Sequence, residues 1–241
     1  MTTYGGGKAR LGKEIYNAIK QIQEEKNWKS NIYFEPFCGM LGVSKYFISL
    51  EQTQIILSDI NKSIILLLNK LKNGNWSLPE MCTKDKYEKL KYSNKHTAER
   101  GFYGVACAYS GIFFAGYRTQ SSSRNFFEKS KSNIKEIGNL LHNHSKKIKI
   151  LNSSYLNFKP KGMTIYCDPP YKNNKFNIEH FNNFDHDLFW ETMKIWSKDN
   201  LVIISEYTAP KDFTCIWSKD IKSVFNAKTD IRTEKLFMYL S

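Results

Sequence analysis

Hydrophobic positions along the first 71 residues alternate between two spacings. Five apolar residues recur every three or four positions and predict an amphipathic helix after the N-terminal glycine run: Leu11, Ile15, Ala18, Ile19 and Ile22. Short apolar strands are predicted over 31–34 and 55–57, and each is followed by helical spacing that ends near Leu50 and Leu71. This alternation of strand and helix is typical of a parallel sheet with helices on its faces.

The pattern changes over residues 72–147, which are basic and aromatic and include a glycine-punctuated run over 101–117. Strand-like runs then return over 148–151, 164–167, 201–204 and 236–240. We therefore predict an α/β fold in which one domain, residues 1–71 and 148–241, is interrupted by a mostly helical central insert.

The charge of the chain is strongly positive and unevenly distributed. There are 36 Lys and Arg against 23 Asp and Glu, a formal net charge of +13. Since 31 of the basic residues are Lys and Asn is also abundant, AT-rich coding is one explanation of this excess. However, residues 72–149 hold 15 basic against 6 acidic side chains, so most of the excess lies in the insert. A basic segment of this kind favours an anionic partner such as nucleic acid.

Neither a membrane nor a metal is indicated. No run approaches the roughly 18 apolar residues of a membrane span, and the N-terminus lacks the apolar core of a signal peptide, so we expect a soluble, intracellular protein. The five cysteines are scattered and lack C-x-x-C spacing, which predicts reduced thiols and neither a disulfide framework nor a zinc site. The rings of His142 and His144 would diverge on a helix, and we expect no metal.

Candidate binding residues follow two predicted strands at the points where the strands end. In open parallel sheets, ligands bind where loops leave the carboxyl ends of the strands. Glycines in the loop over 35–42 would let the backbone approach a ligand, although a purely structural turn would use them too. Asp59 ends the next strand, twenty residues beyond Gly39, and an acid at that spacing binds ribose hydroxyls in nucleoside-binding folds. The alternative for Asp59 is to cap the helix that begins near Asn61.

A third strand-end loop, Asp168-Pro169-Pro170-Tyr171, carries the strongest chemical signal. Two consecutive prolines fix the backbone and remove two N–H donors, so carbonyl oxygens stay exposed beside a carboxylate and an aromatic ring. Such a set can accept two hydrogen bonds from an exocyclic amine while the ring stacks on the base. A turn without chemistry is the alternative.

With these motifs, the sequence resembles the Dam-like (D12 class) DNA adenine-N6 methyltransferases over essentially the whole chain. The resemblance is carried by segments that occur in the order found in the family: 4–8, 34–39, 58–61, 168–171, 205–207 and 232–237. Residues 102–118 are most similar to versions in viral and phage members. The resemblance implies a Rossmann-like methyltransferase fold with a target-recognition insert, in the cytoplasm of a prokaryotic or virus-infected host cell.

The cofactor implied by the resemblance is S-adenosyl-L-methionine. Tyr4 is expected against its adenine, Lys8 near the methionine end or the target base, and Asp59 on the ribose. The remaining cofactor-binding residues that the resemblance implies are Phe37, Cys38, Gly39, Ser154, Tyr155 and Asp168.

Two departures from the family pattern affect the cofactor loops. Family loops usually continue as Gly-x-Gly-Ser, whereas Gly39-Met40-Leu41-Gly42 has one extra residue. An acid is common in the family at the position of Ser154, so the amine of the cofactor adenine needs another acceptor here.

The chemistry implied by the resemblance is methyl transfer to the exocyclic amine of adenine. The Asp168 carboxylate and the Pro169 carbonyl accept hydrogen bonds from the amine and stabilise the charge that develops on nitrogen. Pro170 keeps the loop rigid, and Tyr171 stacks on an adenine flipped out of the duplex. Neither a metal nor a covalent enzyme intermediate is required.

Double-stranded DNA is the expected partner. Besides Lys8, the candidate DNA contacts are residues of the types that read base edges: Arg118, Gln120, Arg124 and Asn125. A solvated loop without such contacts is the alternative. A cognate restriction endonuclease is compatible with the resemblance, and the sequence sets no oligomeric state.

Two rival functions remain at this point. One is an N-methyltransferase that acts on RNA or protein, although such families more often carry Asn at the position of Asp168. The other is a catalytically inactive DNA-binding relative.

Two roles are open for His186. It could act as a general base, or it could stand at the start of a helix near Asp185.

Overall fold

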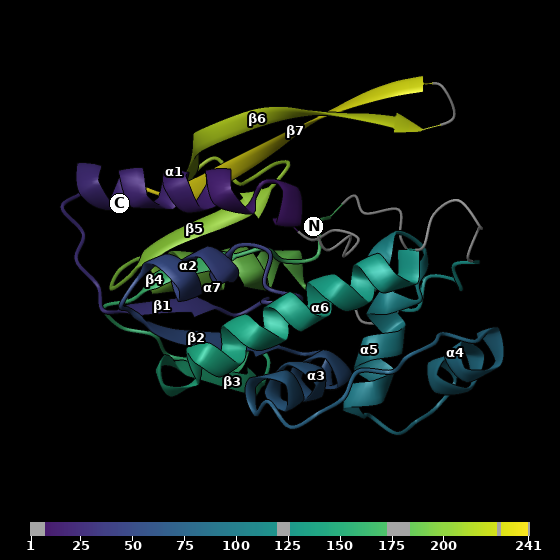
Figure 1. Cartoon of the computed structure of the whole chain (residues 1–241). Coiled ribbons are helices and arrows are strands. Elements are labelled where there is room, and N and C mark those ends of the chain that lie inside the picture. Colours follow the sequence, from purple (N-terminus) through teal and green to yellow (C-terminus); the bar gives the residue numbers. More distant parts are fainter. Residues whose placement is uncertain (1–7, 120–125, 173–183, 226–227, 241) are drawn as a thin grey trace.

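A seven-stranded sheet forms the centre of the protein in a computed structural model that describes residues 8–119, 126–172, 184–225 and 228–240 (Figure 1). The strand order is β3-β2-β1-β4-β5-β7-β6. The first five of these strands are mutually parallel, whereas β7 is antiparallel to both β5 and β6. The strands are β1 (Ile32–Glu35), β2 (Gln54–Asp59), β3 (Ile148–Asn152), β4 (Thr164–Cys167), β5 (Leu201–Glu206), β6 (Phe213–Phe225) and β7 (Lys228–Tyr239).

Both faces of the sheet are covered, which explains why the central strands are apolar at consecutive positions. Every residue of β4 and β5 is buried, as expected of parallel strands with helices on both sides. Alternate side chains enter different cores: Tyr33 belongs to one hydrophobic cluster and Phe34 to the other. The Tyr33 cluster includes residues of α1 (Gly12–Glu25), α2 (Ser44–Leu50) and α3 (Lys62–Lys72), and the Phe34 cluster includes residues of α7 (His186–Trp196).

The predicted elements outside residues 72–147 agree with this architecture. The expected strands coincide with β1 to β5 and with the end of β7, and the expected helices with α1, α2 and α3. The α/β, Rossmann-like fold class is confirmed. Among the described residues, no helix is both long and apolar enough to cross a membrane.

The long β6–β7 hairpin was not predicted beyond residues 236–240. Charged and polar residues such as Lys219 and Asp220 interrupt any apolar run in β6. The hairpin is held by continuous antiparallel pairing from Phe213 opposite Tyr239 to Phe225 opposite Lys228, with a register shift between Cys215 and Trp217. Figure 1 shows it extending beyond the other strands.

The central segment is helical and packs directly on α3. It contains α4 (Lys84–Lys91), α5 (Ala98–Ala106) and α6 (Phe126–Asn143). A Cβ at Gly101 of α5 would overlap the Ser63 carbonyl oxygen, so this glycine permits a close approach of α5 to α3. The division of the chain into a catalytic domain, residues 1–71 and 148–241, and a target-recognition insert over 72–147 stays a prediction.

The expectation that all cysteines are reduced is wrong for one pair. Cys82 and Cys107 form a disulfide between the segment before α4 and the end of α5. They are 25 residues apart, so no short-range spacing marked them in the sequence. The remaining cysteines are free: Cys38 and Cys167 are buried, and Cys215 is exposed.

Cys82→Ser should lower the free energy of unfolding under non-reducing conditions by about 3 kcal/mol, because the disulfide restricts the unfolded chain. Urea denaturation followed by circular dichroism measures this change. Cys215→Ser removes an exposed free thiol and, as the control, should change stability by less than about 0.5 kcal/mol. Equal stability of the two variants would mean that the disulfide does not constrain the fold.

Candidate active site

The candidate residues meet at the carboxyl ends of the parallel strands. Asp59 ends β2, Glu206 ends β5, and Asp168 directly follows β4. The loop after β1 lies beside them, because the Cys38 N–H donates to the Ser58 carbonyl of β2 at 2.9 Å. The short 3-10 helix Lys8–Arg10, which precedes α1, brings Lys8 to the same edge of the sheet.

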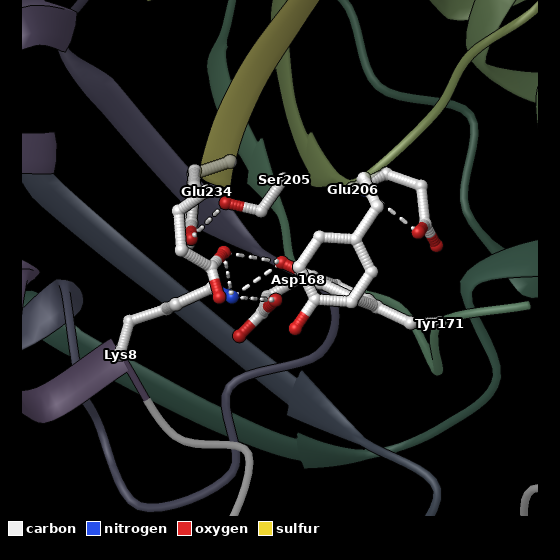
Figure 2. Close-up of polar contacts among 8 residues, drawn as sticks. Lys8, Asp168, Tyr171, Ser205, Glu206 and Glu234 are labelled. Carbon is white, nitrogen blue, oxygen red and sulfur yellow. Dashed lines mark hydrogen bonds and ion pairs between the residues drawn. The ribbon is translucent and has the colours of Figure 1, made fainter. Parts of the chain in front are cut away.

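A buried ammonium group connects the residues around Asp168. The Lys8 side chain is only 7% exposed, and its Nζ lies 2.8 Å from Glu234 Oε2 and 3.4 Å from Asp168 Oδ1 (Figure 2). It also donates a hydrogen bond to the Tyr171 hydroxyl and lies 4.4 Å from the centroid of that ring. The structure therefore brings together Lys8, Asp168 and Tyr171, which are 163 residues apart or less in the sequence.

Glu234 of β7 is the site residue that sequence reasoning missed. Its Oε2 accepts hydrogen bonds from Lys8 and, at 3.1 Å, from the Tyr171 hydroxyl. Its side chain is 12% exposed. The family-like segment 232–237 was the only signal for this residue, and no role was assigned to it from sequence.

Burial controls the protonation of the carboxyl groups at this edge. Burial raises the pKa of Asp168 to about 6, although the positive charge of Lys8 acts in the opposite direction and lowers that pKa. Burial also raises the pKa of Glu206 to about 7 and that of Glu35 to about 8. For Lys8, burial alone would lower the pKa, but the charges of Asp168 and Glu234 outweigh it and raise the pKa. The site thus holds a charged lysine beside a carboxylate that is ionised at neutral pH.

Asp59 ties the loop after β1 to the end of β2. Its Oδ2 accepts the Gly39 N–H at 2.9 Å, and its Oδ1 accepts the Asn61 N–H at 2.8 Å. The side-chain cap of α3 is Asn61, whose oxygen accepts the N–H groups of Ser63 and Ile64. Asp59 is therefore a loop-binding acid and not the cap of this helix.

The glycine loop after β1 has an unusual backbone. Gly39 has φ of 45° and the fully buried Leu41 has φ of 61°, both in the left-handed region. A non-glycine residue in this region costs about 1–3 kcal/mol unless its surroundings fix it, and such residues cluster at functional sites. Here the pairing of Gly39 with Asp59 is one such constraint.

The remaining predicted cofactor residues lie beside this loop in different roles. The Phe37 ring packs 5.4 Å from the ring of the buried Tyr155. Cys38 is 2% exposed, and its N–H group is bonded to the Ser58 carbonyl. The Ser154 hydroxyl accepts the Leu156 N–H and caps the short helix Tyr155–Asn157.

Pro169 is buried and Pro170 half-buried between Asp168 and Tyr171. The Tyr171 ring is nearly perpendicular to the Tyr207 ring, with centroids 4.7 Å apart.

His186 is the first residue of α7, and the Asp185 side chain caps that helix by accepting the Leu188 N–H. The position of His186 at the start of α7 supports the helix-start role over the alternative that His186 is a general base.

The predicted DNA contacts are only partly described. Gln120, Arg124 and Asn125 lie outside the described residues, and so does the predicted cofactor-binding residue Tyr4. The Arg118 guanidinium lies 3.2 Å from the centroid of the Phe126 ring, and the Arg118 N–H donates to the Cys107 carbonyl. Within the described parts of the chain, no group of three or more His, Cys, Asp or Glu side chains is arranged to hold a metal ion.

Comparisons with known proteins give a family and several similar folds. The sequence matches the family model of the D12 class N6 adenine-specific DNA methyltransferases over residues 4–231. The search of curated proteins found no match.

Three solved structures are similar, each with a TM-score of 0.41. A candidate methylase from Haemophilus influenzae is 13% identical, and the alignment covers 96% of this chain and 99% of that one. TrmN from Thermus thermophilus is 9% identical, with 93% and 48% covered, and a candidate RNA methyltransferase from Pyrococcus horikoshii is 8% identical, with 92% and 80% covered.

Gly12→Ala should lower the free energy of unfolding by about 1–3 kcal/mol, because a Cβ at the start of α1 would overlap the Gly42 carbonyl oxygen of the loop after β1. Urea denaturation measures the decrease. Gly138→Ala in α6 is the matched control, since the atoms nearest to its Cβ would be those of the flexible Leu71 side chain, and alanine favours the helix. If both substitutions had the same effect, α1 would not be seated closely on the loop.

Proposed function

The chain belongs to the D12 class N6 adenine-specific DNA methyltransferases, and we propose that Asp168 to Tyr171 carry out its reaction on an adenine flipped out of duplex DNA. The enzyme transfers a methyl group from S-adenosyl-L-methionine to the exocyclic amine of adenine. The observation that carries the assignment of residues is the Asp168 carboxylate, which is held at the end of β4 beside the buried Lys8 and Tyr171.

The strand-end residues fit S-adenosyl-L-methionine by their chemistry. When bound, this cofactor supplies a methyl group on a sulfonium centre. A carboxylate offers about four acceptor positions, and the Asp59 oxygens already accept the N–H groups of Gly39 and Asn61. We propose that Asp59 also accepts the ribose hydroxyls and that the backbone of Phe37 to Gly39 surrounds the methionine part. Lys8, Ser154 and Tyr155, with Tyr4 from outside the described residues, complete the proposed cofactor set.

Asp168 addresses the main chemical difficulty of the reaction. The lone pair of the adenine amine is delocalised into the ring, so the amine is a weak nucleophile. A carboxylate and the Pro169 carbonyl that accept its two N–H groups favour a pyramidal nitrogen and stabilise the positive charge that develops there. Since the pKa of Asp168 is about 6, this carboxylate is ionised at neutral pH.

Tyr171 is the proposed stacking platform for the flipped adenine. Its hydroxyl is bonded to Lys8 and Glu234, and its ring is nearly perpendicular to that of Tyr207, so its orientation is fixed before a base arrives. A fixed ring loses little conformational entropy when a base stacks on it. Pro169 and Pro170 fix the backbone that leads to this ring.

The positively charged segment 72–149 is the proposed DNA-binding surface. Its excess of basic side chains suits the phosphate backbone, and we propose that Arg118, Gln120, Arg124 and Asn125 contact the DNA around the target adenine. For Arg118, the stacking of its guanidinium on Phe126 would restrict the side chain before DNA binds. The enzyme would act inside the cell, where its DNA lies, and a restriction endonuclease partner stays a prediction.

The family match favours DNA adenine over the RNA or protein substrates of other N-methyltransferases. Asp at position 168 is consistent with that reading, because rival families more often carry Asn there. The complete set of Asp59, Asp168 and Tyr171 also favours an active enzyme over an inactive DNA-binding relative.

Asp168→Ala should slow methyl transfer by about 10²- to 10³-fold, the usual cost of one preorganised electrostatic group. The measurement is the rate of tritium transfer from labelled cofactor to duplex DNA. In the wild type, this rate should fall below pH about 6 as the carboxylate becomes protonated.

Asp199→Ala, which changes an exposed carboxylate beyond the end of α7, is the control and should retain full activity. Affinity for DNA should be unchanged in both variants. Full activity of Asp168→Ala would remove this residue from the reaction.

Replacing Lys84, Lys89 and Lys95 together by Gln should reduce the slope of log K for DNA against log salt by about one unit for each phosphate group that the variant no longer neutralises. All three side chains are exposed and lie in the basic segment. Binding to a labelled duplex at several salt concentrations measures the slope.

The matched control replaces Lys26, Lys161 and Lys198, which are also exposed but precede the parallel strands at the opposite edge of the sheet. That triple variant has the same net charge and should keep the wild-type slope. Equal slopes for the two triple variants would contradict a DNA surface on the segment 72–149.

A further inference from the structure

The buried ammonium of Lys8 lies close to two carboxylates, those of Asp168 and Glu234. The nearer one is Glu234, which lies outside the loop over 168–171. The Lys8 Nζ is 2.8 Å from Glu234 Oε2 but 3.4 Å from Asp168 Oδ1 (Figure 2). A lysine ammonium has three N–H donors. Hydrogen bonds to Glu234 and to the Tyr171 hydroxyl use two of them, and the contact with Asp168 is longer. Hydrogen bonding from Lys8 and Tyr171 still lowers the pKa of Asp168, so this carboxylate is only partly engaged.

We propose that Glu234 is a positioning residue for methyl transfer: it holds Lys8 and Tyr171 by direct hydrogen bonds and thereby keeps the Asp168 carboxylate available to the adenine amine. This inference rests on the proposed function, in which Asp168 accepts the N–H of the target. Glu234 itself would contact neither the base nor the cofactor.

The physical basis is competition between two carboxylates for one cation in a largely buried site. Without Glu234, the Lys8 ammonium would have Asp168 as its nearest anionic partner and would move into a short charge-assisted hydrogen bond with it. That bond would occupy acceptor positions of Asp168 and neutralise the charge that stabilises the transition state. Glu234 prevents this by binding the ammonium more closely.

The antiparallel register between β5 and β7 places Glu234 at this position. Glu206 at the end of β5 pairs with Lys235 of β7, so the neighbouring Glu234 lies level with the carboxyl end of β5. The hairpin is also fixed to α1, since Lys219, which pairs with Glu234 across β6 and β7, forms a 2.6 Å ion pair with Glu14. The same helix α1 follows the turn that carries Lys8.

Several other groups face this site and contribute to its electrostatics. They come from four strands and their ends: Glu35 of β1, Tyr166 of β4, Glu206 and Tyr207 at the end of β5, and Arg232 of β7, which bonds to Tyr207. For Asp168, burial raises the pKa most, the Lys8 charge lowers it and the Glu234 charge raises it. Removal of Glu234 or of Lys8 should therefore move the Asp168 pKa in opposite directions.

The test is the pH dependence of the single-turnover rate of methyl transfer for Glu234→Gln and Lys8→Met. In Glu234→Gln, the rate at pH 8 should fall about 10- to 100-fold, the scale of a misplaced reacting group, and the acidic limb of the profile should move to lower pH. In Lys8→Met, the acidic limb should move to higher pH. A role in stability alone would lower the amount of folded enzyme and leave the limb in place.

Two further variants complete the experiment. Glu191→Gln removes an exposed carboxylate on α7 and should match the wild type in rate and profile. Glu234→Asp keeps the charge with a shorter side chain, so its acidic limb should stay at the wild-type pH while the rate falls less than in Glu234→Gln. If Glu234→Gln does not fold, Glu234→Asp and Lys8→Met carry the test.

The outcomes separate this inference from the proposed function. If Asp168→Asn transfers methyl groups at the wild-type rate, the proposed function fails. If Asp168→Asn is inactive while Glu234→Gln keeps both the rate and the acidic limb of the wild type, only the positioning role is overturned. The positioning role would also be overturned if Lys8→Met kept the acidic limb of the wild-type pH profile and Glu234→Asp kept the wild-type rate.

Discussion

The burial of one lysine is the constraint on which the active edge of this protein depends. An ammonium group cannot remain charged away from water without anionic partners, and Lys8 obtains them from distant parts of the chain, Asp168 after β4 and Glu234 in β7. Losing one partner of such a buried pair typically costs about 3–5 kcal/mol. The N-terminal turn, the catalytic loop and the hairpin must therefore assemble together, and a misregistered hairpin would leave a buried charge unpaired.

The proposed cofactor side of the site depends on backbone geometry and not on a buried charge. The loop after β1 contains a buried leucine, Leu41, in the left-handed conformation, and the loop is held by Asp59 and by the close approach of Gly12. A loop fixed in this way presents its amide groups without further rearrangement, which reduces the entropic cost of binding a ligand. The strands on both sides of this loop, β1 and β2, are paired in parallel register from Ile32 opposite Gln54 to Glu35 opposite Leu57.

The sequence predicted the parallel part of the sheet because its strands carry apolar runs, which are longest where a strand is buried on both faces, as in Leu201–Ile204 of β5. It also singled out Asp59, Asp168 and Tyr171, whose residue types and positions after strands point to chemistry. The β6 strand was missed because its polar side chains give no apolar run. Glu234 was missed for a related reason: its function depends on the register between β5 and β7, which no local pattern encodes.

The disulfide illustrates the same limit, since Cys82 and Cys107 become neighbours only when the chain folds back between them.

The fold also explains why the central helices would not act independently of the proposed cofactor site. Helix α3 begins two residues after Asp59 with its cap Asn61, and along its length it packs against α5 and α6. Arg100 of α5 donates a hydrogen bond to the Ser63 hydroxyl in the first turn of α3.

The central helices thus pack on a helix whose cap, Asn61, is bonded through Asp59 to Gly39 of the loop after β1. Packed interiors are stiff and transmit strain over such distances. If the central helices bind DNA as proposed, α3 is the element through which the position of the duplex and the position of the methyl donor are set relative to each other.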